Sequence, residues 1–230
     1  MYDLDIVYPD RPVAALEITA AADSDSIELW RVMNDGERWC AENLEGGWSV
    51  TVDPTARGKF LREDLPELLR RLEGAGMREF RRGHRHPEEL ERAAARLKVV
   101  SAFQGETEFP GSIYPTIELP PERSGGFVGE SGDPLADWLG EFLQDDRRAR
   151  VRSKLARSGA TETHAFVVAL GFSPAPFSVT DLLIRDDPPL PRIDPRLPRE
   201  IGEVWAASSW TAGRVFRWSE RFGWQTFDKW

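Results

Sequence analysis

The sequence predicts a mixed α/β fold, because segments with strand-like alternation are interleaved with segments of helical periodicity. Leu4–Tyr8 and Val13–Thr19 alternate apolar and polar residues on either side of the turn Pro9–Pro12, a pattern typical of a β-hairpin. Between Lys59 and Ala75, apolar residues recur at the three- and four-residue spacing of an amphipathic helix. Both periodicities occur again further along the chain, so we expect a sheet flanked by helices.

The first hundred residues are expected to form strand, strand, helix, strand, helix, helix and strand, in that order. After the hairpin, Asp23–Ser26 offers helix-capping side chains before a short apolar stretch that ends at Asn34-Asp35-Gly36. Pro66 predicts either a kink in the next helix or a start near Glu63. The later elements of this region are a strand at 48–52, helices at 59–75 and 87–96, and a strand at 97–103.

The second half is expected to hold fewer elements and longer connections. A segment rich in Pro, Gly and Ser, 106–132, contains one predicted strand at 113–119. A long helix at 134–157, a strand at 164–170 and aromatic strands at 204–230 follow, with a proline-rich crossing between the last two. We therefore expect a core at 1–105 and a C-terminal α+β extension at 106–230, packed on the core or continuous with it.

Composition excludes several classes of protein. The 230 residues contain one cysteine, Cys40, which rules out a disulfide framework. No run approaches the roughly 18 apolar residues that a spanning helix needs, and the acidic start does not resemble a signal peptide. A cytoplasmic protein without membrane association is expected. The 30 basic and 39 acidic residues give a net charge of −9, which argues against a surface that binds nucleic acid everywhere.

Acidic side chains on the hairpin are the most informative candidates for chemistry. With the turn centred near Arg11, Asp5 would lie opposite Glu17 and Asp3 opposite Thr19, all on one face. Directly opposed acids repel unless a cation lies between them, and Mg²⁺ prefers carboxylates, waters and phosphate oxygens. Such an ion can activate water and stabilise charge on a phosphate. The alternative is that these acids are solvated charges on an edge strand.

This pattern resembles the PD-(D/E)xK nuclease superfamily, in which an Asp on one strand is followed by a (D/E)xK element on the next strand of a hairpin. The matching residues are Asp5 and Glu17-Ile18-Thr19, and the resemblance covers about residues 3–104. It implies a restriction-endonuclease-like mixed sheet flanked by helices. It also implies Mg²⁺ or Mn²⁺ held by Asp5 and Glu17, with Asp3 as a further ligand, and hydrolysis of DNA in restriction or phage defence.

Two departures from the motif bear on activity. Leu4 replaces the motif proline, and Thr19 stands where the family has a lysine that orients water and counters negative charge. A threonine hydroxyl donates a hydrogen bond but carries no charge. The resemblance therefore assigns that role to Thr19 together with Lys59, with Arg57 and Arg62 as other candidates. The competing interpretation is a nuclease-like fold without catalysis, acting as a binding or scaffold subunit.

Two basic clusters are candidates for phosphate contacts. Solvated charge is the alternative for both, and DNA and RNA both remain open as substrates. Because the net charge is acidic, a partner protein or further domain is expected to deliver the substrate. The nucleic-acid candidates are Arg81, Arg82 and Arg85 in the first cluster and Arg147, Arg150 and Lys154 in the second.

Glu162-x-His164 is a separate candidate. Its histidine is either a base or a metal ligand, or else a core histidine whose hydrogen bonds are satisfied.

Overall fold

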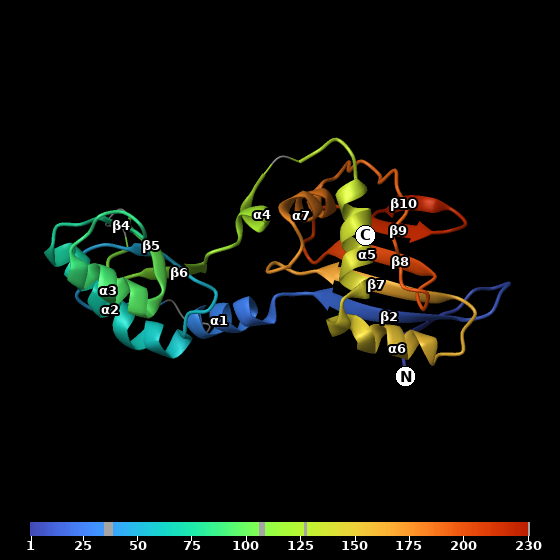
Figure 1. Ribbon diagram of the computed structural model, residues 1–230, viewed down its shortest axis with the longest axis horizontal. Coiled ribbons are helices and arrows are strands. Elements are labelled where there is room, and N and C mark those ends of the chain that lie inside the picture. The colour runs from blue at the N-terminus through green and yellow to red at the C-terminus, as the bar shows by residue number, and fades with distance from the viewer. Residues whose placement is uncertain (35–38, 106–108, 127, 230) are drawn as a thin grey trace. The chain divides into compact units, whose positions relative to one another are not determined.

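The computed structural model describes residues 1–34, 39–105, 109–126 and 128–229. The chain forms two compact units, one made of Met1–Ala22 with Pro121–Trp230 and the other of Asp23–Pro120 (Figure 1). Each unit has its own mixed β-sheet, so the predicted α/β class is confirmed. Among the described residues, every helix is too short or too polar to cross a bilayer.

The first unit is built on a six-stranded sheet in the order β1-β2-β7-β8-β9-β10. Its three central strands run parallel to one another, and the remaining neighbours are antiparallel. The strands are β1 (Leu4–Ile6), β2 (Ala14–Ala21), β7 (Thr163–Ala169), β8 (Glu203–Ser208), β9 (Val215–Ser219) and β10 (Gly223–Phe227).

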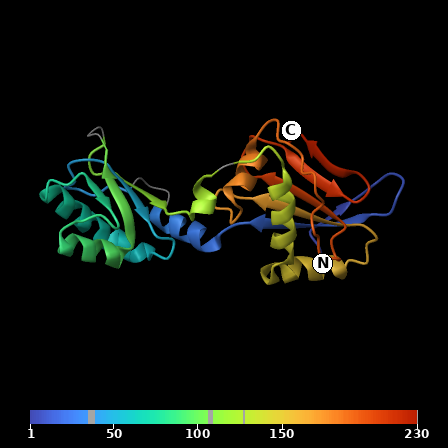
Figure 2. The ribbon, with the colours of Figure 1, turned by 45° about the horizontal axis from the view of Figure 1, so that its top comes forward.

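Helices cover one face of this sheet, and α5 lies across it in Figure 2. Along β2, Ala15, Glu17, Thr19 and Ala21 are buried, whereas the residues between them are more exposed. Because side chains alternate along a strand, the buried set marks the helix-covered face, where small alanines let the helices pack closely. The helices are α4 (Pro121–Ser124), α5 (Asp133–Gln144), α6 (Ala149–Ala156) and α7 (Phe177–Ile184), with a 3-10 turn at Asp146–Arg148 before α6.

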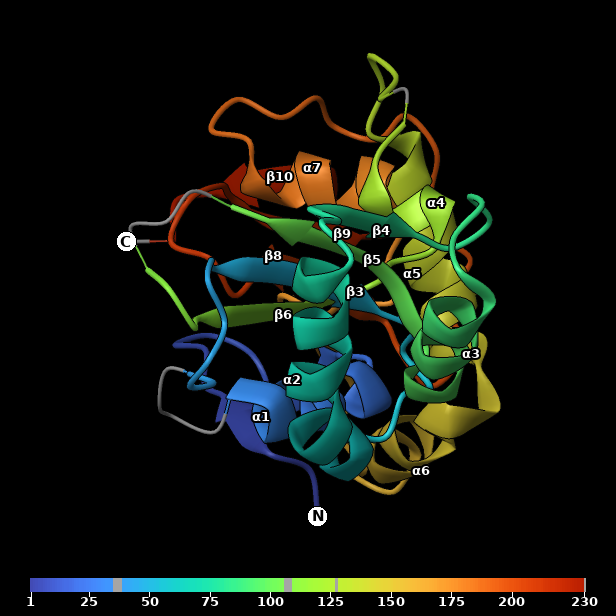
Figure 3. The same ribbon diagram turned by 90° about the vertical axis from the view of Figure 1, so that its left-hand side faces the viewer.

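The second unit carries a four-stranded sheet in the order β4-β5-β3-β6. Leucines at helical spacing on α2 are buried against it, as the periodicity predicts, and Pro66 is accommodated inside that helix. Figure 3 faces this unit and shows α2 and α3 in front of its sheet. Its elements are α1 (Ser24–Asn34), β3 (Trp48–Val52), α2 (Gly58–Gly74), β4 (Glu79–Arg81), α3 (Glu88–Leu97), β5 (Val99–Gln104) and β6 (Ile113–Ile117).

Glu73 ties the end of α2 to the sheet of the second unit. Its carboxylate accepts hydrogen bonds from Trp48 Nε1 at 2.9 Å, Gln104 Nε2 at 2.8 Å and the backbone N–H of Glu45 at 3.0 Å. The Trp48 side chain is fully buried, so its indole N–H depends on this carboxylate for a partner.

The structure divides the chain differently from the predicted parts 1–105 and 106–230. The first two strands pair with each other, and β2 also pairs with β7 of the C-terminal half, whereas the segment 23–120 forms a separate unit between them in sequence. The prediction of one long helix at 134–157 is wrong. Asp145 has an extended conformation that interrupts the helix, and it caps the 3-10 turn that follows. Neither β4 nor α7 was expected. The predicted helix end at Asp35-Gly36 lies outside the described residues.

Candidate functional site

The hairpin register differs from the prediction by two residues. Asp5 lies opposite Ala15, not opposite Glu17, because the pairing is centred on Asp10 and not on Arg11. Moving the centre of a hairpin by one residue shifts every cross-strand pair by two. Asp5 is exposed, and its carboxylate accepts a hydrogen bond of 2.6 Å from the Tyr2 hydroxyl. The expectation that Asp5 and Glu17 form the metal pair is therefore not supported by the geometry.

The same register brings Asp3 next to Glu17 in place of Asp5. The backbone N–H of Asp3 donates to the carbonyl of Leu16 at 3.2 Å, which extends the ladder beyond the end of β1. Asp3 Oδ2 accepts the backbone N–H of Ile18 at 3.0 Å, so the side chain is held against β2. Asp3, predicted only as a further ligand, is the acid that accompanies Glu17.

Lys154 of α6 contacts both acids. Its Nζ donates to Glu17 Oε1 at 2.5 Å and to Asp3 Oδ1 at 3.1 Å. Glu17 is only 4% exposed, and its other oxygen, Oε2, is buried without a hydrogen-bond partner among the described residues. A buried carboxylate oxygen without a partner is rare in native structures and is a common feature of ligand sites.

The electrostatics of the site follow from these contacts. The hydrogen bond from the backbone of Ile18 lowers the pKa of Asp3, and Lys154 lowers it further. The hydrogen bonds to Glu17 and then Asp3 raise the pKa of Lys154. Asp3 is therefore a carboxylate and Lys154 an ammonium over a wide pH range, so the acids retain ligand oxygens beside a fixed positive charge.

Arginines line the hollow that opens beside these three residues. Asp145 binds the guanidinium of Arg147, which lowers the pKa of Asp145 to about 2. Arg148 lies over the Phe142 ring, with its Cζ 4.3 Å from the ring centroid. Arg150 is exposed and makes no ion pair in the part of the chain that the structure describes. The hollow is lined by Asp3, Glu17, Thr19, Arg147, Arg150 and Lys154, among others.

Other predicted site residues lie elsewhere or play a different part. Thr19 is buried on the same face as Glu17 and lines the hollow. Lys59 belongs to the second unit, where it is exposed and its nearest described acid is Glu63 at 3.9 Å. Among the described residues, Lys154 and not Lys59 is the lysine that contacts Glu17.

The remaining basic candidates also belong to the second unit. Arg57 lies over the Phe60 ring, and Arg62 donates to backbone carbonyls of α1. The first basic cluster is largely occupied by neighbouring acids. Arg81 pairs with Glu79 at 2.5 Å, Arg82 pairs with Glu118 at 3.0 Å, and Arg85 is exposed.

Sequence reasoning placed Lys154 among phosphate-binding residues and missed its contact with the acids. The two partners Lys154 and Glu17 are 137 residues apart, so no local spacing could indicate the contact. Comparison with family models, with curated proteins and with solved structures gives no match to this chain.

Proposed function

We propose that the chain is a metal-dependent phosphodiesterase that hydrolyses DNA at the Asp3–Glu17–Lys154 site, on a restriction-endonuclease-like fold. One observation carries the proposal: a buried carboxylate, one oxygen of which has no hydrogen-bond partner in the described part of the chain, lies beside a second carboxylate and a lysine. Two acids and a lysine are the residue types that the resemblance to PD-(D/E)xK nucleases implies, with Asp3 in place of Asp5 and Lys154 of α6 in place of a lysine on the hairpin. Restriction or phage defence is the biological role we associate with this activity.

The donor set fits a hard divalent cation. Glu17 Oε2 has no hydrogen-bond partner within the described residues, and Asp3 adds an ionised carboxylate next to it. Mg²⁺ and Mn²⁺ accept one or two such carboxylates and complete their shells with water and phosphate oxygens. When bound there, the ion would supply an activated water and charge neutralisation at the phosphate.

Lys154 and Thr19 would act on the substrate phosphate. The ammonium of Lys154 is held by two acids in the hollow, so it can donate a hydrogen bond to a phosphate oxygen as negative charge develops there. Thr19 lies two residues after Glu17 on the same face, where its hydroxyl can orient a water. Lys154 thereby supplies the positive charge that Thr19 lacks.

The arginines give the hollow its affinity for a nucleic-acid backbone. Arg147, Arg150 and Lys154 border it together, although Arg147 is already bound by Asp145. Arg150 is the exposed member without a described partner, so it is the residue that we assign to a flanking phosphate. The net charge of −9 over the whole chain favours substrate delivery by a partner or a further domain.

A second candidate function is a scaffold without catalysis. Lys154 lies within hydrogen-bond distance of both acids, so its ammonium can replace a metal ion as their counter-charge. In that case the acids and the lysine form a structural ion cluster, and the hollow binds nucleic acid or protein without cleaving it. The two functions differ in their response to divalent cations.

Cleavage of supercoiled plasmid with Mg²⁺ or Mn²⁺ tests the first proposal. We expect Glu17→Gln and Asp3→Asn to lose at least about a hundredfold in rate, because each removes a charged group from the reacting centre. Asp5→Asn is the matched control, since Asp5 lies on the same strand and face but is held by Tyr2. Single-stranded RNA is assayed in parallel to decide the substrate.

Two results would contradict the proposal. No cleavage of DNA or RNA by the wild-type chain with either ion would favour the scaffold function. Loss of activity in Asp5→Asn with activity retained in Asp3→Asn would mean that the sequence-based register, not the observed one, describes the active hairpin.

A further inference from the structure

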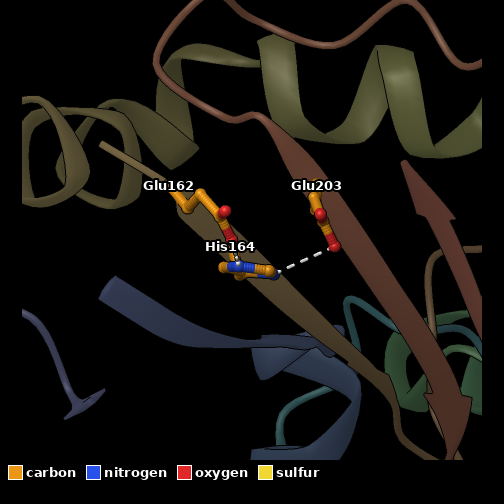
Figure 4. A group of neighbouring side chains, drawn as sticks. All are labelled: Glu162, His164 and Glu203. Atoms are coloured by element: carbon orange, nitrogen blue, oxygen red, sulfur yellow. Dashed lines mark ion pairs between the residues drawn. The ribbon is translucent and has the colours of Figure 1, made fainter. Parts of the chain in front are cut away.

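A second cluster of metal-ligating side chains lies on the opposite face of the same sheet. Ala165 pairs with Glu17, so the neighbouring His164 projects from the other side of β7. His164 lies beside Glu203, its paired residue on β8, and close to Glu162, which directly precedes β7. Figure 4 shows the imidazole of His164 with the two glutamates reaching it from neighbouring segments.

The three side chains offer ligand atoms at close range. One nitrogen or oxygen from each of Glu162, His164 and Glu203 lies within 4.8 Å of the other two. His164 Nδ1 is 3.4 Å from Glu203 Oε2, and His164 Nε2 is 3.9 Å from Glu162 Oε2. The second distance is too long for a hydrogen bond.

Two of these atoms are buried without partners. His164 is completely buried, and neither its Nε2 nor Glu162 Oε2 has a hydrogen-bond partner among the described residues. Burying two polar atoms that face each other without hydrogen bonds costs free energy, unless an ion or a water molecule lies between them. Bonds of about 2.1 Å from a zinc ion to a nitrogen and an oxygen can span a gap of up to about 4.2 Å.

Neighbouring residues hold the ligands in place without filling this gap. Arg11 binds the other oxygen of Glu162 at 3.0 Å, and Arg217 binds Glu203 Oε2 at 2.6 Å. The two arginines offset the charges of the two glutamates, so a bound cation would add net positive charge. A neutral imidazole is the form that binds metals.

We propose that a borderline divalent cation such as Zn²⁺ binds between His164 Nε2 and Glu162 Oε2, with Glu203 orienting the imidazole through Nδ1. Imidazole nitrogen favours such ions over Mg²⁺. Carboxylates commonly hold the second nitrogen of a metal-bound histidine in this way. A hollow bordered by Arg11, Glu162, Gly202, Glu203 and Phe222 adjoins the cluster.

The proposal requires a change of tautomer. In the structure, Trp205 Nε1 donates to His164 Nδ1 at 3.2 Å, which leaves the proton of a neutral ring on Nε2. A metal on Nε2 moves that proton to Nδ1, where it is donated to Glu203. When the metal binds, His164 Nδ1 therefore stops accepting a hydrogen bond from Trp205 and donates one to Glu203. This change of tautomer is observable.

Nitrogen NMR of the full-length chain during a ZnCl₂ titration tests the site directly. The chain has only three histidines, so His164 can be assigned by comparison with His164→Gln. We expect its ring-nitrogen resonances to shift to the Nδ1–H tautomer with one equivalent of Zn²⁺ and to be unaffected by MgCl₂. Glu162→Gln is expected to weaken this response at least tenfold, because it replaces a charged ligand.

Two controls separate this site from others. Glu17→Gln should leave the His164 response unchanged, so failure of the nuclease proposal and failure of this one are distinguishable. His86→Gln tests the exposed His84-x-His86 segment as a competing zinc site. The side chain of Glu162 is 33% exposed, so Glu162→Gln tests the site even if His164→Gln does not fold.

The zinc titration either supports the proposed site or overturns it. Zinc-dependent shifts at His164 that weaken in Glu162→Gln support the site. Zinc binding that leaves the His164 resonances unchanged, or that is equally strong in Glu162→Gln, would overturn it. The gap would then be assigned to a bridging water molecule.

Discussion

Replacing Lys154 by methionine should strengthen Mg²⁺ binding and weaken catalysis at the same time. The ammonium lies 2.5 Å from Glu17 Oε1 and 3.1 Å from Asp3 Oδ1. Glu17 Oε2 is the proposed ligand oxygen, so an ion bound to it at about 2.1 Å would lie within about 7 Å of Nζ. At that separation, repulsion between a unit charge and a divalent ion weakens binding about tenfold even in water.

The expected result is thus an opposite change in two measurements. Isothermal titration with MgCl₂ should give a dissociation constant about tenfold lower for Lys154→Met. Plasmid cleavage should slow by about a hundredfold or more, because the charge that stabilises the phosphate is lost. A structural ion cluster without a metal site predicts no Mg²⁺ binding in either protein.

Two further variants isolate the effect of position from that of charge. Arg150→Met removes a positive charge from the same hollow without touching the acids, so its Mg²⁺ affinity should change less. Lys154→Arg keeps the charge and should bind Mg²⁺ much as the wild type does. Weaker Mg²⁺ binding in Lys154→Met than in the wild type would refute the assignment of the ion to Asp3 and Glu17.

Three further predictions concern stability and titration. Glu73→Ala should lower the free energy of unfolding by about 3 kcal/mol in chemical denaturation, because buried donors such as the Trp48 indole N–H lose their acceptor. Gly213→Ala should cost at least about 2 kcal/mol by the same measurement, since φ is 85° and a Cβ would clash with the backbone carbonyl oxygen of Leu183. By carboxyl NMR, Arg147→Gln should raise the pKa of Asp145 from about 2 toward 3.8. Because the pKa of Asp145 is lowered in the folded state, its ionised form stabilises the fold above about pH 4, and this stabilisation is lost as the pH falls toward 2. The dependence of stability on pH in this range should therefore be weaker in Arg147→Gln.

The two stability predictions each have a control. Glu67→Ala removes another glutamate of α2 that makes only exposed ion pairs, and it should change stability little. Gly76→Ala also has a positive φ, of 70°, but a Cβ there meets nothing within 4 Å, so only backbone strain of about 1 kcal/mol is expected. If Glu67→Ala destabilised the chain as much as Glu73→Ala, the hydrogen bonds of Glu73 would not account for its effect. If Gly76→Ala destabilised it as much as Gly213→Ala, the clash at Gly213 would not account for its effect. An unchanged Asp145 pKa in Arg147→Gln would contradict the ion pair.

Most elements could be predicted because their signals are local. The leucines of α2 repeat at helical spacing, and Trp48–Val52 alternates as a strand does. The prediction of one helix across 134–157 was wrong because a side-chain cap at Asp145 outweighed the helical pattern. The short strand β4 has only three residues, too few for a periodic signal.

The candidate site was predicted in part. The hairpin and the importance of Glu17 followed from the alternation of its strands, and Asp3 was included as a further ligand. The choice between Asp3 and Asp5 could not be made, because both acids lie on the same face and only the register separates them. That register depends on how the seven residues between β1 and β2 turn, and local pattern does not determine it.

By itself, the sequence determined the α/β class, the positions of most helices and strands, and the presence of acids on an N-terminal hairpin. Periodicity suffices for these features because each is decided within one or two turns of helix or one strand. Only the tertiary structure decided that Lys154 reaches Glu17, that Asp5 does not, and that the segment 23–120 forms its own unit. These contacts join residues far apart in the chain, and they depend on which surfaces are buried together.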